Sequence, residues 1–190
     1  LSFIDYFIIN ELSKNIDAYR LSTYLYKDSD EHKGKINMGP IWDYNLAYGN
    51  VNYCNGFNPD GWLLHEDFDC GGGIPIFWSD LLENTSFQDG LLSRWKSLRE
   101  TTLNVDSIFN TIDEIVLTLK DAKDRNFNKW DILREYVWPN YSINRSHRGE
   151  IEFLKYWLFN RISWIDKHIV NPELILDFCS INDAGPVHII

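Results

Sequence analysis

Two short acidic elements are the parts of the sequence best suited to carry chemistry. They are Asn15-Ile16-Asp17 and Asp43-Tyr44-Asn45. A positioned carboxylate can orient or deprotonate an acceptor group, and carboxylate and amide oxygens are ligands that suit Mg²⁺ or Mn²⁺. Asp17 and Asp43, once brought together, would therefore support a metal-assisted reaction. The alternative is structural, with Asp17 ending a helix and Asp43 capping the next turn.

The segments around these acids predict a helix followed by a β-hairpin. Apolar residues recur at helical spacing over residues 2–14, which predicts a well-buried helix that ends near Asn15. Residues 20–28 and 35–43 favour strands and flank a polar stretch, so they predict a hairpin. The end of the helix and the end of the second strand can then meet. An extended backbone over 43–45 would place both oxygen ligands on one face.

The rest of the chain is predicted to be an irregular loop followed by helices. Residues 50–75 are rich in Gly, Asn and Asp and predict an ordered, irregular loop. The chain from Pro75 onward is predicted to be mainly helical, which gives an α+β fold dominated by helices, with a small β-hairpin. The expected helices cover 76–84, 87–100, a long segment capped by Asn104 or Asp106, and about 148–169, with a polar junction over 121–130 and a segment over 131–142 that Pro139 stops.

The expected domain boundary follows the last of these helices. We expect one domain over residues 1–171, and a linker or the start of another module over 172–190, because Asn171-Pro172 follows the helix. The sequence opens directly in a helical pattern. Residue 1 is therefore expected to be an internal position of a longer precursor, with an N-terminal lobe and any export signal upstream.

Composition and charge narrow the classes of function. Hydrophobic residues make up 44% and charged residues 24% of the 190 residues, which predicts a folded core rather than disorder. A net charge of −10 argues against nucleic acid as the main partner. It fits either a solvated acidic surface or a site for a divalent cation or a basic protein substrate. The apolar run near the N-terminus is too short to span a membrane, and nothing in the sequence indicates an oligomeric state.

The three cysteines do not have the spacing of a zinc site, because no Cys-x-x-Cys motif occurs. Cys54 and Cys70 lie in the same irregular loop. A disulfide between them would close a loop of about 15 residues, contribute roughly 3 kcal/mol and imply an oxidising compartment. Unpaired thiols in a cytosolic protein are the alternative.

Three ordered blocks in the first 49 residues resemble a known family. Residues 15–20 contain Asn-x-Asp-x-Tyr, residues 24–28 contain Tyr-x-Tyr, and residues 39–49 contain Pro-x-Trp-Asp-Tyr-Asn-x-x-Tyr-Gly. In this order and spacing they are similar to the core of the CotH kinase family of spore-coat kinases. Later stretches around Gly61-Trp62, 78–82, 94–99 and 137–140 resemble Bacteroides-type members, so the resemblance covers roughly residues 2–170.

The resemblance implies an atypical protein kinase with a kinase C-lobe-like helical body. Such enzymes use ATP and a divalent ion, Mg²⁺ or Mn²⁺, to phosphorylate Ser or Thr of proteins, here in a secreted or cell-envelope location in a bacterium. By position, Asp17 would be the catalytic aspartate that serves the acceptor hydroxyl, and Asp43 with Asn45 would hold the metal. The resemblance places Arg20, Ser22 and Trp42 on the nucleotide side of the site.

Several alternatives stay open at this point. Arg20 could neutralise phosphate or pair with Asp17, and Trp42 could line the cleft or fill the core. Because the nucleotide-clamping residues of a kinase lie in its N-terminal lobe, residues 1–190 alone are expected to bind ATP poorly. Some fungal members of the family act as adhesins, so the other expected function is an extracellular binding module with a degenerate site.

Overall fold

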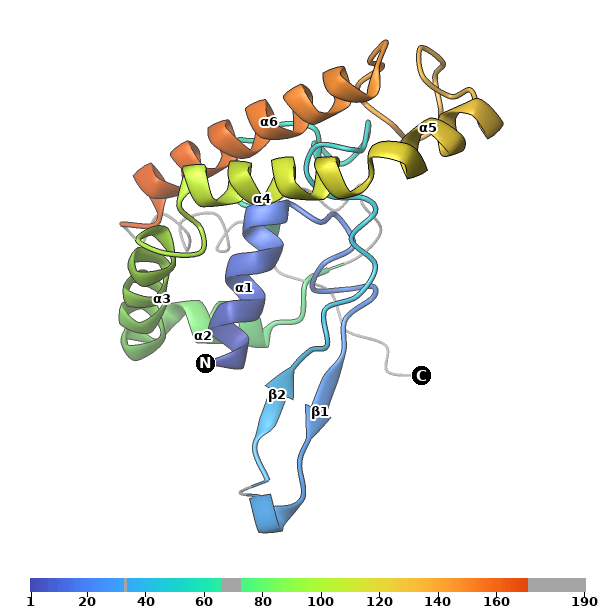
Figure 1. The fold of residues 1–190 in the computed structure, drawn as a ribbon. Helices are drawn as coiled ribbons and strands as arrows, with labels where there is room; N and C mark the ends of the chain where they lie inside the picture. The colour runs from blue at the N-terminus through green and yellow to red at the C-terminus, as the bar shows by residue number, and fades with distance from the viewer. Residues whose placement is uncertain (33, 66–72, 171–190) are drawn as a thin grey trace.

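The computed structural model describes residues 1–32, 34–65 and 73–170, and these form a mainly helical body with a two-stranded antiparallel sheet. This confirms the predicted fold class. The elements are α1 (Ser2–Ser13), β1 (Leu25–Lys27), η1 (Asp30–His32), β2 (Ile36–Met38), η2 (Leu63–His65), α2 (Phe77–Glu83), α3 (Thr85–Arg99), α4 (Val105–Thr118), α5 (Lys120–Lys129) and α6 (His147–His168) (Figure 1).

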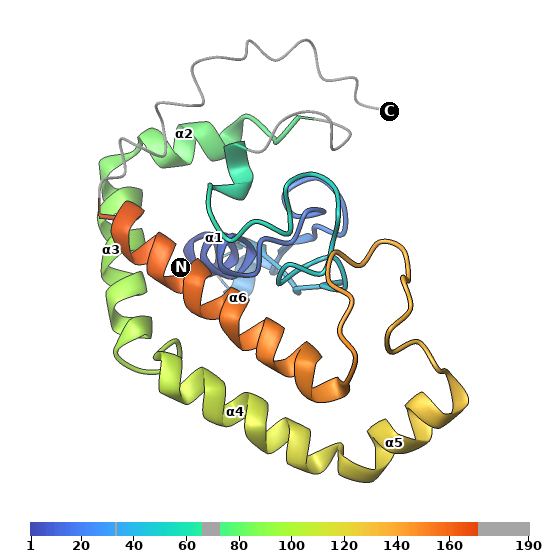
Figure 2. The same ribbon diagram turned by 90° about the horizontal axis from the view of Figure 1, so that it is seen from above.

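Helix α1 stands at the centre, as its apolar pattern requires. Helices α4 and α6 cross its C-terminal end, α2 and α3 lie to one side, and the β1–β2 hairpin points away from the body (Figure 1). Seen from above, α3, α4 and α5 follow one another in an arc outside α6 (Figure 2). Phe7, Ile8 and Leu12 of α1 are buried, and so is Trp78 of α2, which stacks on Tyr6 with ring centroids 6.0 Å apart. Burial of such large side chains is the main stabilising term.

The predicted hairpin is present but its strands are much shorter than expected. Leu25 pairs with Met38, Tyr26 with Asn37 and Lys27 with Ile36. Met38 is the one buried residue in these strands, so little apolar surface supports longer pairing. The hairpin is anchored at its base, where the Met38 N–H donates to Ser2 Oγ at 3.3 Å.

Two predictions for the second half of the chain are wrong. The polar junction expected over 121–130 is mostly α5, and the segment over 131–142 is not helical. No residue of α5 is buried, so this helix has no stripe of apolar residues at helical spacing, which is the signal that predicts a helix from sequence. The 131–142 segment is instead held by ring stacking, since Trp138 lies flat against Tyr53 at an interplanar angle of 3°.

A buried ion pair ties α1 to α6. Glu11 and Arg161 are 2% and 0% exposed at the side chain, and Arg161 Nη2 lies 3.2 Å from Glu11 Oε2. The backbone N–H groups of Leu63 and Leu64 donate to the Glu11 carboxylate at 2.7 and 3.1 Å. The Arg161 guanidinium donates to the carbonyls of Glu11 and Pro59, each at 2.7 Å. The pair therefore joins α1, α6 and the loop over 59–64, which are far apart in sequence.

Removing one member of this pair is expected to destabilise the fold strongly. In Arg161→Met the Glu11 carboxylate stays buried without its counter-charge, so the free energy of unfolding should fall by about 3–5 kcal/mol. The matched control is Arg148→Met, because Arg148 pairs with Glu152 on the exposed face of the same helix; its change should stay within about 0.5 kcal/mol. Urea denaturation measures both. Similar stabilities for the two variants would contradict the structural role given to Arg161.

Candidate active site

Asp17 lies in the loop that follows α1. Lys14 ends that helix in a left-handed conformation with φ 48°, and the chain then turns so that the Asp17 carbonyl accepts from Leu21 N–H at 2.9 Å. The side chain is half-buried. Burial is the main cause that raises the pKa of Asp17, the nearby Arg20 guanidinium lowers it, and the charge of Asp43 raises it again. The structure thus brings the two predicted acids within electrostatic range of each other.

Asp43 lies in the loop that follows β2 and is exposed. Its φ of 64° is left-handed, so the extended backbone predicted for 43–45 is interrupted at its first residue. Aspartate tolerates this conformation better than most residues. Ser22 Oγ donates to Asp43 Oδ2 at 3.5 Å, which is long for a hydrogen bond. This contact links the loop after α1 to the loop after β2. Asn45 is exposed, two residues further along.

Backbone hydrogen bonds hold the two loops together. The Ile16 N–H donates to Leu46 O at 3.2 Å, and the Tyr48 N–H donates to Ser13 O at 2.7 Å. The Tyr44 hydroxyl donates to Oδ1 of buried Asn10 at 2.8 Å, which fastens the second loop to α1. Burial raises the pKa of the Tyr44 phenol, so this donor keeps its proton at neutral pH. The two loops are thereby held together, and the charges of Asp17 and Asp43 lie within electrostatic range of each other.

The predicted nucleotide-side residues have different surroundings. The Arg20 Nη2 donates to Ile16 O at 2.7 Å, and its charge also favours the ionised form of Asp17. Both alternatives considered for Arg20 therefore remain compatible with its position. Trp42 is 60% exposed, so a core role for it in this chain is wrong, and its ring faces solvent beside Asp43.

Sequence reasoning missed one aromatic residue beside the acids. Asp17 contributes to raising the pKa of Tyr53, after the larger effect of burial, so the phenol lies within electrostatic range of the carboxylate. Tyr53 stacks on Trp138, which is 68% exposed, with ring centroids 6.1 Å apart. Asn52 Nδ2 donates to Tyr136 Oη at 2.7 Å next to this stack. No local pattern could have found it, because Tyr53 and Trp138 lie in two irregular segments far apart in sequence.

The acid pair suits a phosphate-bound magnesium site better than an all-protein metal cage. Within residues 1–32, 34–65 and 73–170, no group of three or more His, Cys, Asp or Glu side chains could hold a metal ion. Mg²⁺ in phosphoryl-transfer sites keeps several waters and is held by one or two carboxylates together with substrate phosphates. Two carboxylates match that donor set, and a nearby cation would offset the charge of Asp43, which adds to the larger effect of burial in raising the pKa of Asp17.

Two further predictions concern the surroundings of the site. Cys54 is disulfide-bonded, as predicted, while its predicted partner Cys70 lies outside the described residues. None of the helices in the described part of the chain is long and apolar enough to cross a membrane. Residues 66–72 of the predicted irregular loop and residues 171–190 also lie outside the described residues, so the domain boundary predicted after residue 171 stays a prediction.

A mainly helical body whose first loops hold paired carboxylates next to a hairpin is the arrangement predicted for a kinase-family domain. The family model described as CotH kinase protein matches residues 1–165, and the chain belongs to the CotH kinase family. Membership of this family suggests an atypical kinase, a phosphotransferase that uses ATP. A search of curated proteins and a search of solved structures each gave no significant match.

The electrostatic contact between the two acids can be tested by titration. Asp43→Asn removes a negative charge near Asp17 and should lower the pKa of Asp17, whereas Arg20→Gln removes a positive charge and should raise it. Carboxyl ¹³C chemical shifts measured against pH report both changes. Asp30→Asn, in the distant η1 turn at the hairpin tip, is the control and should leave the Asp17 titration in place. An Asp17 titration that ignores Asp43→Asn would show that the two acids do not interact.

Proposed function

We propose that this domain transfers the γ-phosphoryl group of ATP to a Ser or Thr hydroxyl of a protein in a metal-dependent reaction. The observation that carries the proposal is the convergence of Asp17 and Asp43 from two loops, close enough for one charge to shift the pKa of the other. Phosphoryl transfer requires mainly positioning and charge neutralisation from the protein. Asp17, Asp43 and the nearby Arg20 can supply this positioning and this charge neutralisation at one place.

In this proposal Asp17 serves the acceptor. The hydroxyl oxygen forms a bond to the γ-phosphorus, the bond from that phosphorus to the β–γ bridging oxygen breaks, and ADP leaves. The acceptor proton goes to the Asp17 carboxylate, whose raised pKa makes it a better proton acceptor than a fully solvated aspartate. Tyr53 and Trp138 form an aromatic wall beside Asp17 against which the acceptor polypeptide can lie.

Asp43 serves the nucleotide side in the same proposal. Asp43, with Asn45, would hold Mg²⁺ or Mn²⁺, and the ion when bound neutralises charge on the transferring phosphoryl group. Ser22 lies next to the Asp43 carboxylate and Arg20 next to Asp17, so both can contact phosphate oxygens. The exposed ring of Trp42 is available to stack on a base or ribose.

The proposed setting is a secreted or cell-envelope protein of a bacterium. The disulfide at Cys54 supports it, because disulfides persist in oxidising compartments. The resemblance of later motifs to Bacteroides-type members points the same way. The acceptor would then be a protein exposed to the same compartment.

A binding module is the second candidate. Trp42 and Trp138, both more than half exposed, are the observation that favours it, since exposed indole rings beside a site suit adhesion to another molecule. An adhesin with a degenerate site would keep the aromatic surface without needing ATP. The two experiments below separate these functions.

The metal role of Asp43 predicts a specific loss of activity. Asp43→Asn keeps the left-handed backbone that Asn also tolerates, so its free energy of unfolding should change by less than about 1 kcal/mol. Transfer of labelled γ-phosphate to protein in the presence of Mn²⁺ should fall at least about 100-fold. The assay uses the longest natural chain that contains residues 1–190, so that any flanking lobe is present. Asp30→Asn is the matched control, and a fully active Asp43→Asn would refute the metal role.

Nucleotide binding gives a test that does not depend on knowing the acceptor. ATP with Mg²⁺ or Mn²⁺ should raise the melting temperature of the same chain, because a ligand that binds the folded state stabilises it by mass action. ATP with excess chelator should give a much smaller shift, and Asp43→Asn should remove the metal-dependent part. The absence of any shift with either ion would favour the adhesin.

A further inference from the structure

Helix α1 carries two buried polar side chains one turn apart, and each is hydrogen-bonded toward a different loop of the two-acid site. Tyr6 is 5% exposed and Asn10 is 1% exposed. Residues four positions apart lie on the same face of a helix, so both side chains leave α1 on one side. Asn10 Nδ2 donates to the Tyr6 carbonyl at 2.8 Å, which fixes the orientation of the buried amide.

Asn10 holds the loop that carries Asp43. With its Nδ2 bound to α1, the amide presents Oδ1 to the Tyr44 hydroxyl, which donates to it at 2.8 Å. An apolar side chain at this place would fill the core without needing partners, whereas a buried amide is stable only when it is hydrogen-bonded. Because Tyr44 follows Asp43 directly, this bond ties the acid to the helix.

Tyr6 holds the loop that carries Asp17. The Thr23 hydroxyl donates to the Leu21 carbonyl at 2.9 Å, so the Tyr6 hydroxyl is the donor in its own 2.9 Å contact with Thr23 Oγ1. The Leu21 N–H in turn donates to the Asp17 carbonyl at 2.9 Å. Hydrogen bonds therefore connect Tyr6 with the backbone of Asp17 through Thr23 and Leu21.

We propose that Tyr44 and Asn10 are positioning residues, which set the separation of the Asp17 and Asp43 carboxylates and so determine how tightly the site binds its divalent ion. The inference rests on the proposed phosphotransferase function. Neither residue is a proposed metal ligand, and both act through the backbone of Asp43. A site must hold its ligands within about 0.5 Å of the productive geometry, and a side chain anchored on a buried helix can do so.

Removing the Tyr44 hydroxyl tests this role. In Tyr44→Phe the ring stays and the bond to Asn10 is lost, and loss of a group that supports a metal ligand commonly costs about 10- to 100-fold in metal affinity. Isothermal titration of the longest natural chain with Mn²⁺ and a non-hydrolysable ATP analogue should show a loss of at least about tenfold. Tyr48→Phe is the matched control in the same loop, because the Tyr48 hydroxyl has no hydrogen-bond partner among the described residues, and it should bind Mn²⁺ as the wild type does.

A double variant separates positioning from stability. Tyr44→Phe leaves the buried Asn10 amide without its donor, which by itself lowers the free energy of unfolding. Tyr44→Phe combined with Asn10→Leu removes both polar partners, so the stability should recover above that of the single variant while the Mn²⁺ affinity stays low. Without metal, hydrogen exchange at the Ile16 and Tyr48 amides, which bridge the two loops, should be faster in both variants than in the wild type.

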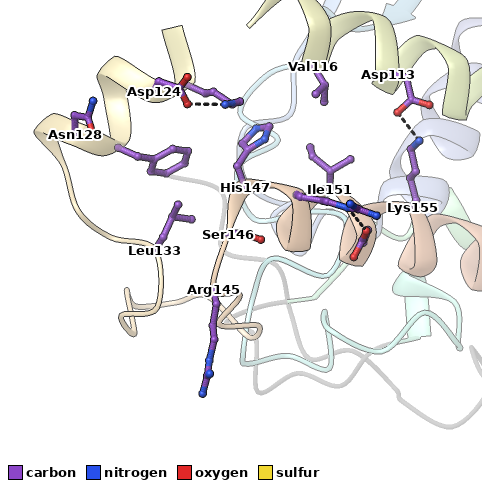
Figure 3. Close-up of a pocket in the computed structure, with 14 residues that line it drawn as sticks. Asp113, Val116, Asp124, Asn128, Leu133, Arg145, Ser146, His147, Ile151 and Lys155 are labelled. Atoms are coloured by element: carbon purple, nitrogen blue, oxygen red, sulfur yellow. Dashed lines mark hydrogen bonds and ion pairs between the residues drawn. The ribbon is translucent and has the colours of Figure 1, made fainter. Parts of the chain in front are cut away.

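A polar contact between two other elements supplies a second control. Asp113 of α4 pairs with Lys155 of α6 at 2.6 Å beside a pocket of about 740 Å³, and neither helix carries an acid of the site (Figure 3). Asp113→Ala breaks this contact and should leave the Mn²⁺ affinity unchanged. Equal Mn²⁺ affinity of Tyr44→Phe and the wild type, or an equal loss in Asp113→Ala, would overturn the inference alone. A wild-type chain that binds no Mn²⁺ with nucleotide would overturn the proposed function and this inference with it.

Discussion

The buried pairing of Glu11 with Arg161 is the interaction on which the rest of the structure depends. Charges this deep are unfavourable unless each polar atom has a partner, and here the surrounding backbone supplies them. The Glu11 carboxylate accepts hydrogen bonds from the N–H groups of Leu63 and Leu64. The Arg161 guanidinium donates hydrogen bonds to the carbonyls of Pro59 and Gly61. A loop that is irregular apart from the short η2 turn is thereby fixed to two helices.

The same buried charges position the two-acid site. The Tyr19 hydroxyl donates to Glu11 Oε1 at 3.0 Å, and Tyr19 lies only two residues after Asp17. Lys14, which ends α1, is fully buried, and its Nζ donates to the carbonyls of Asn58 and Asp60 at 3.1 and 2.7 Å. The residues on both sides of Asp17 are therefore held from the interior, which leaves the carboxylate itself at the surface.

The sequence could predict those parts of the fold and the site that depend on interactions between residues close together in the chain. The apolar period of α1 and α6, the Asn104 cap and the order of helix, hairpin and acidic loop are all encoded within short windows. Helix α5 has no apolar face, and the stack of Tyr53 on Trp138 joins two irregular segments, so neither leaves a local pattern. Glu11 and Arg161 did leave a signal, because each is a charge within an apolar stripe, and such a charge calls for a buried partner.

The loops of the site combine a strained backbone with a rigid support. Tyr19, Ser22, Asp43 and Tyr48 all have positive φ, a conformation that costs roughly 1–2 kcal/mol for most residues. Such strain persists only where surrounding contacts determine the backbone, and here the hydrogen bonds from Ile16 to Leu46 and from Tyr48 to Ser13 do so. Burial is the main cause that raises the pKa of Asp17, Arg20 lowers it, and the like charge of Asp43 makes a smaller contribution that raises it. A bound cation would offset this like-charge contribution, and the rigid loops would hold both carboxylates in place for it, as the proposed metal-dependent transfer requires.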